Sequence, residues 1–106
     1  MQKLTKDFYS SKKLDEQRWE VTFSDATHPV FKAHFEGNPL VPAFLQIDIF
    51  GEIMAKELRK IERCKFKLPI LPNDSVIYKI VKVVENNYKI KIYKDEQEVS
   101  ELRVVY

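Results

Sequence analysis

Apolar and polar residues alternate along residues 18–24 (RWEVTFS), with Trp19, Val21 and Phe23 on one side and polar residues on the other. A period of two is typical of a strand with one buried face, so this segment predicts a half-buried β-strand. Residues 25–42 lose the alternation and hold three of the five prolines of the chain. Because proline interrupts regular backbone hydrogen bonding, we expect an irregular loop there.

A helical pattern begins at Pro42, a residue that suits the first turn of a helix. From Ala43 to Ala55 nearly every position is apolar, so three helical turns lack a polar face. A helix that is apolar all round is expected to be buried on all sides. The polar segment from Lys56 to Arg63 then predicts a last, exposed helical turn.

The last third of the chain has the pattern of antiparallel strands separated by turn residues. The predicted strands and the turns that follow them are KFKLPIL (65–71) with Asn73–Asp74, VIYKIVKVV (76–84) with Asn86–Asn87, YKIKIY (88–93) with Asp95–Glu96, and a final strand over 99–106. Strand, loop, buried helix and about four further strands predict an α+β fold. In this fold a long central helix is wrapped by a curved antiparallel β-sheet.

The length of 106 residues is that of one domain, expected over 1–106 with the polar residues 1–13 loosely held. A domain of this size has little room for a deep cleft of its own. We therefore expect dimerisation, with the site completed at the subunit interface. Charged residues make up 32% of the chain and apolar residues 44%, a composition typical of soluble globular proteins.

The net charge of +2 is too balanced to indicate nucleic-acid binding. No apolar run approaches the length of a membrane span and no secretory signal pattern is present, so a cytoplasmic protein is expected. The single cysteine, Cys64, excludes an intrachain disulfide and a cysteine-rich metal site. We expect no cofactor and no metal.

Asp48 is the most unusual residue of the apolar helix, because Ile47 and Ile49 flank it. A carboxylate in such surroundings must be paired, hydrogen-bonded or shifted in pKa. Glu52 follows one helical turn later on the same stripe, and like charge is expected to raise one pKa of the pair. The alternative is that Asp48 and Glu52 face solvent along a thin polar seam.

Both histidines of the chain, His28 and His34, lie in the loop that precedes this helix. A histidine beside a carboxylate is suited to acid–base chemistry near neutral pH, although a lone loop histidine is more often a surface or stapling residue. The helix start also offers free backbone N–H groups near Ala43 and Phe44 that can polarise a carbonyl oxygen. Two histidines and one acid at this spacing do not predict a metal site.

The two glycines have separate structural explanations. Gly37 is the only glycine of the loop and is expected to supply a positive φ before Asn38. Gly51 lies inside the helix, where it costs about 1 kcal/mol relative to alanine. The close approach of another backbone segment is the explanation we favour for it.

Two segments together resemble a known family. The run HPVFKAHFEGNPLVPAFLQID (28–48) resembles the signature of the hot-dog-fold 3-hydroxyacyl-[acyl-carrier-protein] dehydratases, roughly H-P-x-F-x-G-H-F-x-G-x-P-x-x-P-G-x-L-x-x-[DE]. The run FKLPILPND (66–74) is similar to the second landmark of that family, F-x-R-P-x-x-P-G-D.

This resemblance implies a hot-dog fold and dehydration of 3-hydroxyacyl thioesters in fatty-acid or related lipid biosynthesis. His34 falls on the catalytic base, Asp48 on the catalytic acid, and the Ala43 N–H on the group that binds the thioester oxygen. Substrate contacts are also expected from Gly37, Phe44 and Glu52. The resemblance further implies a homodimer or trimer of dimers that pairs His34 of one subunit with Asp48 of the other. The substrate would be carried on the phosphopantetheine of an acyl carrier protein.

Four positions depart from the family pattern. Ala43 replaces the usual glycine, Leu68 an arginine and Asn73 another glycine, while Glu52 stands where a glutamine is often found. If Asp48 and Glu52 share a proton, the site already holds an acid suited to proton donation. Because hot-dog folds also host thioesterases and non-catalytic members, two alternatives stay open: a hot-dog thioesterase, and a non-catalytic acyl-binding subunit, which Ala43 and Glu52 favour.

A group of basic residues surrounds the end of the predicted helix, namely Lys56, Arg59, Lys60, Arg63, Lys65 and Lys67. Such a surface would attract an acidic carrier protein. An equally good explanation is that these residues complement the negative end of the helix dipole. Lys89, Lys91 and Lys94 lie on the outer face of a predicted strand and could protect it from edge pairing.

Overall fold

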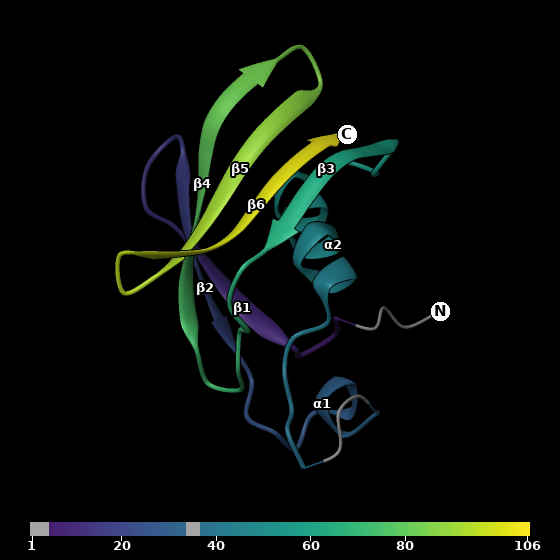
Figure 1. Cartoon of the computed structure of the whole chain (residues 1–106), viewed down its shortest axis with the longest axis vertical. Coiled ribbons are helices and arrows are strands. Elements are labelled where there is room, and N and C mark those ends of the chain that lie inside the picture. Colours follow the sequence, from purple (N-terminus) through teal and green to yellow (C-terminus); the bar gives the residue numbers. More distant parts are fainter. Residues whose placement is uncertain (1–4, 34–36) are drawn as a thin grey trace.

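The computed structural model describes residues 5–33 and 37–106, which form one antiparallel sheet and two helices (Figure 1). Within these residues the elements are β1 (Tyr9–Lys13), β2 (Arg18–Phe23), α1 (Pro29–Ala33), α2 (Ala43–Met54), β3 (Lys60–Phe66), β4 (Ser75–Val84), β5 (Asn87–Lys94) and β6 (Gln97–Val105). The strand order is β1-β2-β4-β5-β6-β3, and each neighbouring pair is antiparallel. β1 and β3 are therefore the two edges of the sheet.

Helix α2 packs on the face of the sheet that carries the buried side chains of the alternating strands, and the sheet curves around it (Figure 1). Phe50 occupies the centre of this contact and is fully buried. Its ring lies nearly parallel to that of Tyr78 at 6.1 Å and edge-on to that of Trp19 at 5.9 Å. Aromatic pairs in these geometries stabilise a core beyond the area they bury. The predicted helix wrapped by a curved antiparallel sheet is confirmed.

Buried hydroxyl groups fix the rotation of α2 against the sheet. The Tyr78 hydroxyl donates to the Gln46 carbonyl oxygen at 2.9 Å, and the Tyr106 hydroxyl donates to the Ile47 carbonyl oxygen at 2.7 Å. Ser100 donates to the Gln46 side-chain oxygen at 2.6 Å. Burial raises the pKa of both tyrosines, so they remain neutral donors.

The predicted polar last turn of the helix is wrong. Helix α2 ends at Met54, and Ala55 adopts left-handed backbone angles (φ 55°, ψ 45°). The Ala55 N–H bonds to Glu52 O and the Lys56 N–H to Gly51 O, which is the Schellman arrangement. The chain then extends into β3, which pairs with β6 along its length. Residues with good helix propensity are held in a strand there by tertiary pairing.

Other boundaries also differ from the sequence prediction. The expected irregular loop contains the short helix α1, which buries Val30 and Phe31. Tyr9–Lys13, expected to be loosely held, pair with β2 as β1. The strand expected over 65–71 instead occupies Lys60–Phe66, so the proline-containing residues that follow lie outside it.

The positive φ predicted at Gly37 is confirmed. Gly37 has a φ of 81°, and Asn73, in place of a family glycine, has a φ of 67°. The Asp95–Glu96 turn is also present, with positive φ at both residues (50° and 68°). These are the signs of a type I′ hairpin turn between β5 and β6.

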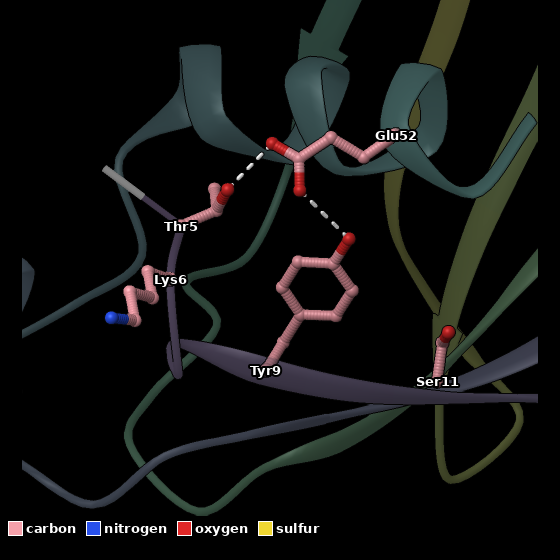
Figure 2. A pocket seen from close by; sticks show the side chains of 5 residues that line it. All are labelled: Thr5, Lys6, Tyr9, Ser11 and Glu52. Carbon is pink, nitrogen blue, oxygen red and sulfur yellow. Dashed lines mark hydrogen bonds between the residues drawn. The ribbon is translucent and has the colours of Figure 1, made fainter. Parts of the chain in front are cut away.

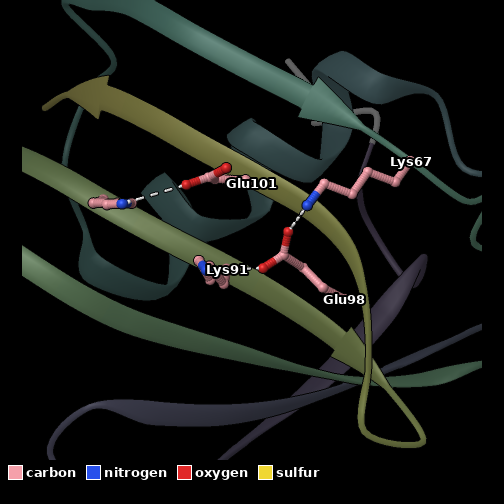
Figure 3. Close-up of polar contacts among 5 residues, drawn as sticks. Lys67, Lys91, Glu98 and Glu101 are labelled. Carbon is pink, nitrogen blue, oxygen red and sulfur yellow. Dashed lines mark hydrogen bonds and ion pairs between the residues drawn. The ribbon is translucent and has the colours of Figure 1, made fainter.

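Ion pairs cover the outer face of the sheet over β5 and β6 (Figure 3). Lys91 lies 3.0 Å from Glu98 and Lys89 lies 3.5 Å from Glu101, while Lys67 also pairs with Glu98. The hydrogen bonds from Lys67 and then Lys91 lower the pKa of Glu98. Because β5 is an inner strand, the interpretation that its lysines protect an edge is wrong.

Candidate active site

One stripe of helix α2 is not covered by the sheet. Phe44 and Asp48 are exposed, with 48% of Phe44 accessible, and Glu52 is half-buried one turn further on. Residues four apart lie on the same face of a helix, so the three side chains form one row. The expectation of burial on all sides therefore fails along this row, and the alternative of a polar seam describes it better for the single chain.

Asp48 has no hydrogen-bond donor among the residues that the structure describes. Partial shielding from water, followed by the charge of Glu52, raises the pKa of its carboxyl group. Asp48 and Glu52 line one cavity with Lys56 and Tyr106. The negative charge of Asp48 also contributes, after burial, to the raised pKa of Tyr106.

Glu52 connects α2 to the N-terminal part of the chain (Figure 2). The Thr5 hydroxyl donates to Glu52 Oε2 at 2.5 Å, and the Tyr9 hydroxyl donates to Oε1 at 2.9 Å. No hydrogen bond joins the Asp48 and Glu52 carboxyl groups. Neither Thr5 nor Tyr9 is among the site residues predicted from the sequence. Tyr9 belongs to a mostly polar strand, YSSKK, in which the aromatic ring is the only feature that could have indicated a site residue.

The start of α2 leaves backbone donors free. The N–H groups of Ala43 and Phe44 have no hydrogen-bond acceptor in the described parts of the chain, and Pro42 provides no side-chain cap. Both residues are exposed in the single chain. They lie one turn before Asp48 on the uncovered side of the helix.

The second landmark segment holds this helix start in place. The Val41 N–H donates to the Ile70 carbonyl oxygen at 2.8 Å, just before α2 begins. The Asp74 carboxylate in turn accepts from the Leu71 N–H at 2.7 Å and from Lys94 at 2.9 Å. The landmark therefore supports the site through the backbone and does not contribute a side chain to it.

The structure describes one of the two histidines of the chain, His28, but not the other, His34. His28 is a stapling residue: its Nε2 lies 2.7 Å from the Lys6 carbonyl oxygen, and its Nδ1 accepts from the Val30 N–H at 3.1 Å. His34, predicted as the catalytic base, lies outside the residues that the structure describes. Gly37, predicted to contact substrate, lies in an exposed turn.

No cluster of three His, Cys, Asp or Glu side chains suited to a metal ion occurs in residues 5–33 and 37–106. None of their helices is long and apolar enough to cross a membrane.

A helix wrapped by a curved antiparallel sheet, with one stripe of the helix left open, defines a protein of the hot-dog fold. The model of the ApeI-like family, described as ApeI dehydratase, matches residues 10–103. The chain therefore belongs to the ApeI-like dehydratase family.

Two curated proteins of similar sequence are also named as dehydratases. The chain is 35% identical over 86 residues to the 3-hydroxyacyl-[acyl-carrier-protein] dehydratase FabZ of Fusobacterium nucleatum, covering 67% of this chain and 61% of that protein. It is 34% identical over 70 residues to the FabZ of a Wolbachia strain of Drosophila simulans, covering 54% of this chain and 47% of that protein. The match thus spans less than two thirds of either relative.

A solved structure has the same fold. A chain of the dehydratase heterocomplex ApeI:P from Xenorhabdus doucetiae superposes with a TM-score of 0.68 at 21% identity. The match covers 91% of this chain and 92% of that one. At this identity the similarity concerns the fold, and it confirms the hot-dog architecture expected from the sequence.

Proposed function

We propose that this chain catalyses the dehydration of 3-hydroxyacyl thioesters, carried on an acyl carrier protein, to trans-2-enoyl thioesters in fatty-acid or related lipid biosynthesis. The observation that carries the proposal is the placement of Asp48. It is exposed on the open face of the central helix, one turn after the free N–H groups of Ala43 and Phe44. Membership of a dehydratase family and the names of the FabZ relatives point to the same reaction class.

The proposed reaction divides between a base, an acid and an oxyanion donor. His34 removes the proton from C2 of the substrate, and the Ala43 N–H stabilises the negative charge on the thioester oxygen. Asp48 gives a proton to the 3-hydroxyl group as the C3–O bond breaks, so that water leaves and the C2–C3 double bond forms. The raised pKa of Asp48 suits this role, because a general acid must hold its proton near the operating pH.

A second copy of the chain is proposed to complete the site. The stripe of Phe44 and Asp48 is uncovered in the single chain, and β3 is an edge strand with an exposed Ile61. Unpaired edges of this kind favour pairing with another chain. In the proposed homodimer, His34 of one subunit acts with Asp48 of the other.

The deciding experiment follows the absorbance of the enoyl thioester when the purified protein meets 3-hydroxyacyl thioesters of several chain lengths. We expect activity in the wild type and a loss of at least a hundredfold in both His34→Ala and Asp48→Asn, since one positioned acid or base contributes roughly 10²–10⁴-fold. Circular dichroism must show that both variants are folded. Release of free thiol without enoyl product would show that the protein is a thioesterase and not a dehydratase.

A non-catalytic acyl-binding subunit is the second candidate. Ala43 places a methyl group where the family usually has glycine, beside the proposed path of the thioester. The ApeI:P structure is itself described as a heterocomplex of a dehydratase. A wild-type protein that is inactive on every thioester tested, yet binds an acyl carrier protein, would favour this candidate. Recovery of activity in Ala43→Gly would identify the methyl group as the cause.

A further inference from the structure

The two carboxyl groups on the open stripe of α2 have unequal surroundings. Each oxygen of Glu52 accepts a hydrogen bond, one from Thr5 at 2.5 Å and one from Tyr9 at 2.9 Å (Figure 2). Asp48, one turn earlier, accepts none from the described residues. Hydrogen bonds donated to a carboxylate favour its ionised form, so the hydroxyl groups stabilise charge on Glu52 and not on Asp48.

Burial holds Thr5 in the turn before β1, and packing holds Tyr9 within β1. Thr5 is 6% exposed, and the Tyr9 ring packs against the core from β1. Burial, followed by the hydrogen bond to Glu52, raises the pKa of Tyr9, so its hydroxyl stays protonated and can donate. Glu52 therefore cannot turn toward Asp48 without giving up both hydrogen bonds.

Other ionisable groups also line the cavities around the two acids. They are Lys6 and Tyr9 from the N-terminal part, Lys56 and Glu57 from the segment after α2, and Tyr106 after β6. Lys56 donates to the Tyr88 hydroxyl at 3.0 Å. Neither Lys6 nor Lys56 forms an ion pair with Asp48 or Glu52.

We propose that Thr5 and Tyr9 hold Glu52 as the ionised member of the pair, so that a single proton on the two carboxyl groups resides on Asp48. Glu52 is then a positioning residue that acts through its fixed charge. When two neighbouring carboxyl groups lose protons in turn, the last proton stays where ionisation is least stabilised. The raised pKa of Asp48, to which the charge of Glu52 contributes after desolvation, agrees with this assignment.

The experiment is a carbon NMR titration of the side-chain carboxyl groups in the full chain, which needs no substrate. In the wild type we expect the Asp48 Cγ signal to titrate at higher pH than exposed aspartates, while Glu52 Cδ remains at its ionised position over that interval. In Glu52→Gln the Asp48 midpoint should move to lower pH. The upper proton is the one that the pair of carboxyl groups loses at the higher pH. In the Thr5→Val/Tyr9→Phe double variant, the upper proton should move from Asp48 to Glu52.

Matched controls separate this effect from general changes of charge or structure. Glu57→Gln removes a carboxylate from the same cavity as Asp48 without touching Thr5 or Tyr9. Ser11→Ala removes a hydroxyl from the cavity that Thr5 and Tyr9 line. Both controls should leave the Asp48 titration as in the wild type. Tyr9→Phe alone retains the ring, and it takes the place of the double variant in the titration if the double variant does not fold.

Two results would overturn the proposal: an Asp48 midpoint unchanged by Glu52→Gln, or a wild type in which Glu52 Cδ holds the upper proton. The inference rests on the proposed function only for the role of Asp48 as acid. In an active protein, Glu52→Gln should also move the alkaline limb of the pH–rate profile to lower pH, because the acid loses its proton earlier. An inactive protein with the expected titrations would reject the dehydration and leave the proton assignment intact.

Discussion

A Cβ atom built on Gly51 would lie 3.0 Å from the Lys56 carbonyl oxygen and 3.0 Å from Cε1 of Tyr106. The sequence predicted close approach of another backbone segment at this glycine, and the Lys56 contact confirms it. The Tyr106 ring cannot withdraw freely, because its hydroxyl bonds to the Ile47 carbonyl oxygen at 2.7 Å. At this one position the absence of a side chain decides how closely the end of the chain packs on α2.

Gly51→Ala should therefore destabilise the fold despite its better helix propensity. Overpacking costs about 1–3 kcal/mol, and the propensity gain of about 1 kcal/mol offsets part of it. We expect a net loss of up to about 2 kcal/mol in the free energy of unfolding, measured by urea denaturation. Ala55→Gly is the matched control: it relieves a left-handed alanine (φ 55°) and should stabilise by about 0.5–1 kcal/mol. A Gly51→Ala variant more stable than the wild type by about 1 kcal/mol, the full propensity gain, would show that the Tyr106 contact adjusts without cost.

At the scale of elements, tertiary pairing overrides local preference twice. Residues after Met54 have good helix propensity but become β3, because the backbone of β6 offers an edge for hydrogen bonding. The polar segment Tyr9–Lys13 becomes β1 because β2 offers the other edge. In contrast, the alternating strands β2 and β5 lie where their patterns predict them, since a buried face fixes their register.

The turn between β5 and β6 carries strain that can be relieved. Asp95 and Glu96 both have positive φ, a conformation that aspartate tolerates but that glutamate adopts at a cost. Replacing the pair by Asn-Gly should stabilise the protein by about 1 kcal/mol, seen as a higher urea midpoint. The double alanine variant removes the same charges without relieving the backbone and should bring no gain. A gain in the alanine variant would assign the effect to charge.

At the scale of the whole molecule, the proposed site joins distant parts of the chain. Thr5 and Tyr9 come from the N-terminal region, Asp48 and Glu52 from α2, and Tyr106 follows β6. The open stripe of α2 and the β3 edge are both uncovered in one chain. A second copy placed against them would bury the exposed apolar side chains and close the site.

The dimer proposal is tested by charging one edge residue. Ile61 on β3 is 52% exposed, and Val83 on β4 is 48% exposed and serves as its control. Ile61→Glu should weaken self-association at least tenfold, or about 1.4 kcal/mol, whereas Val83→Glu should leave it unchanged. Light scattering on a dilution series measures both. If Val83→Glu is monomeric and Ile61→Glu is still dimeric, the interface lies on the β4–β5 hairpin instead.

The sequence by itself determined the central helix, the alternating strands, the turn at Asp95–Glu96 and the candidate acid Asp48. These features depend on local periodicity, backbone conformation and the cost of a charge among apolar neighbours. Only the tertiary structure decided where α2 ends, that β1 and β3 form the edges, and that Thr5 and Tyr9 donate to Glu52. The β3–β6 pairing and the hydrogen bonds to Glu52 join residues more than 30 positions apart in the chain, and no local pattern encodes such partners.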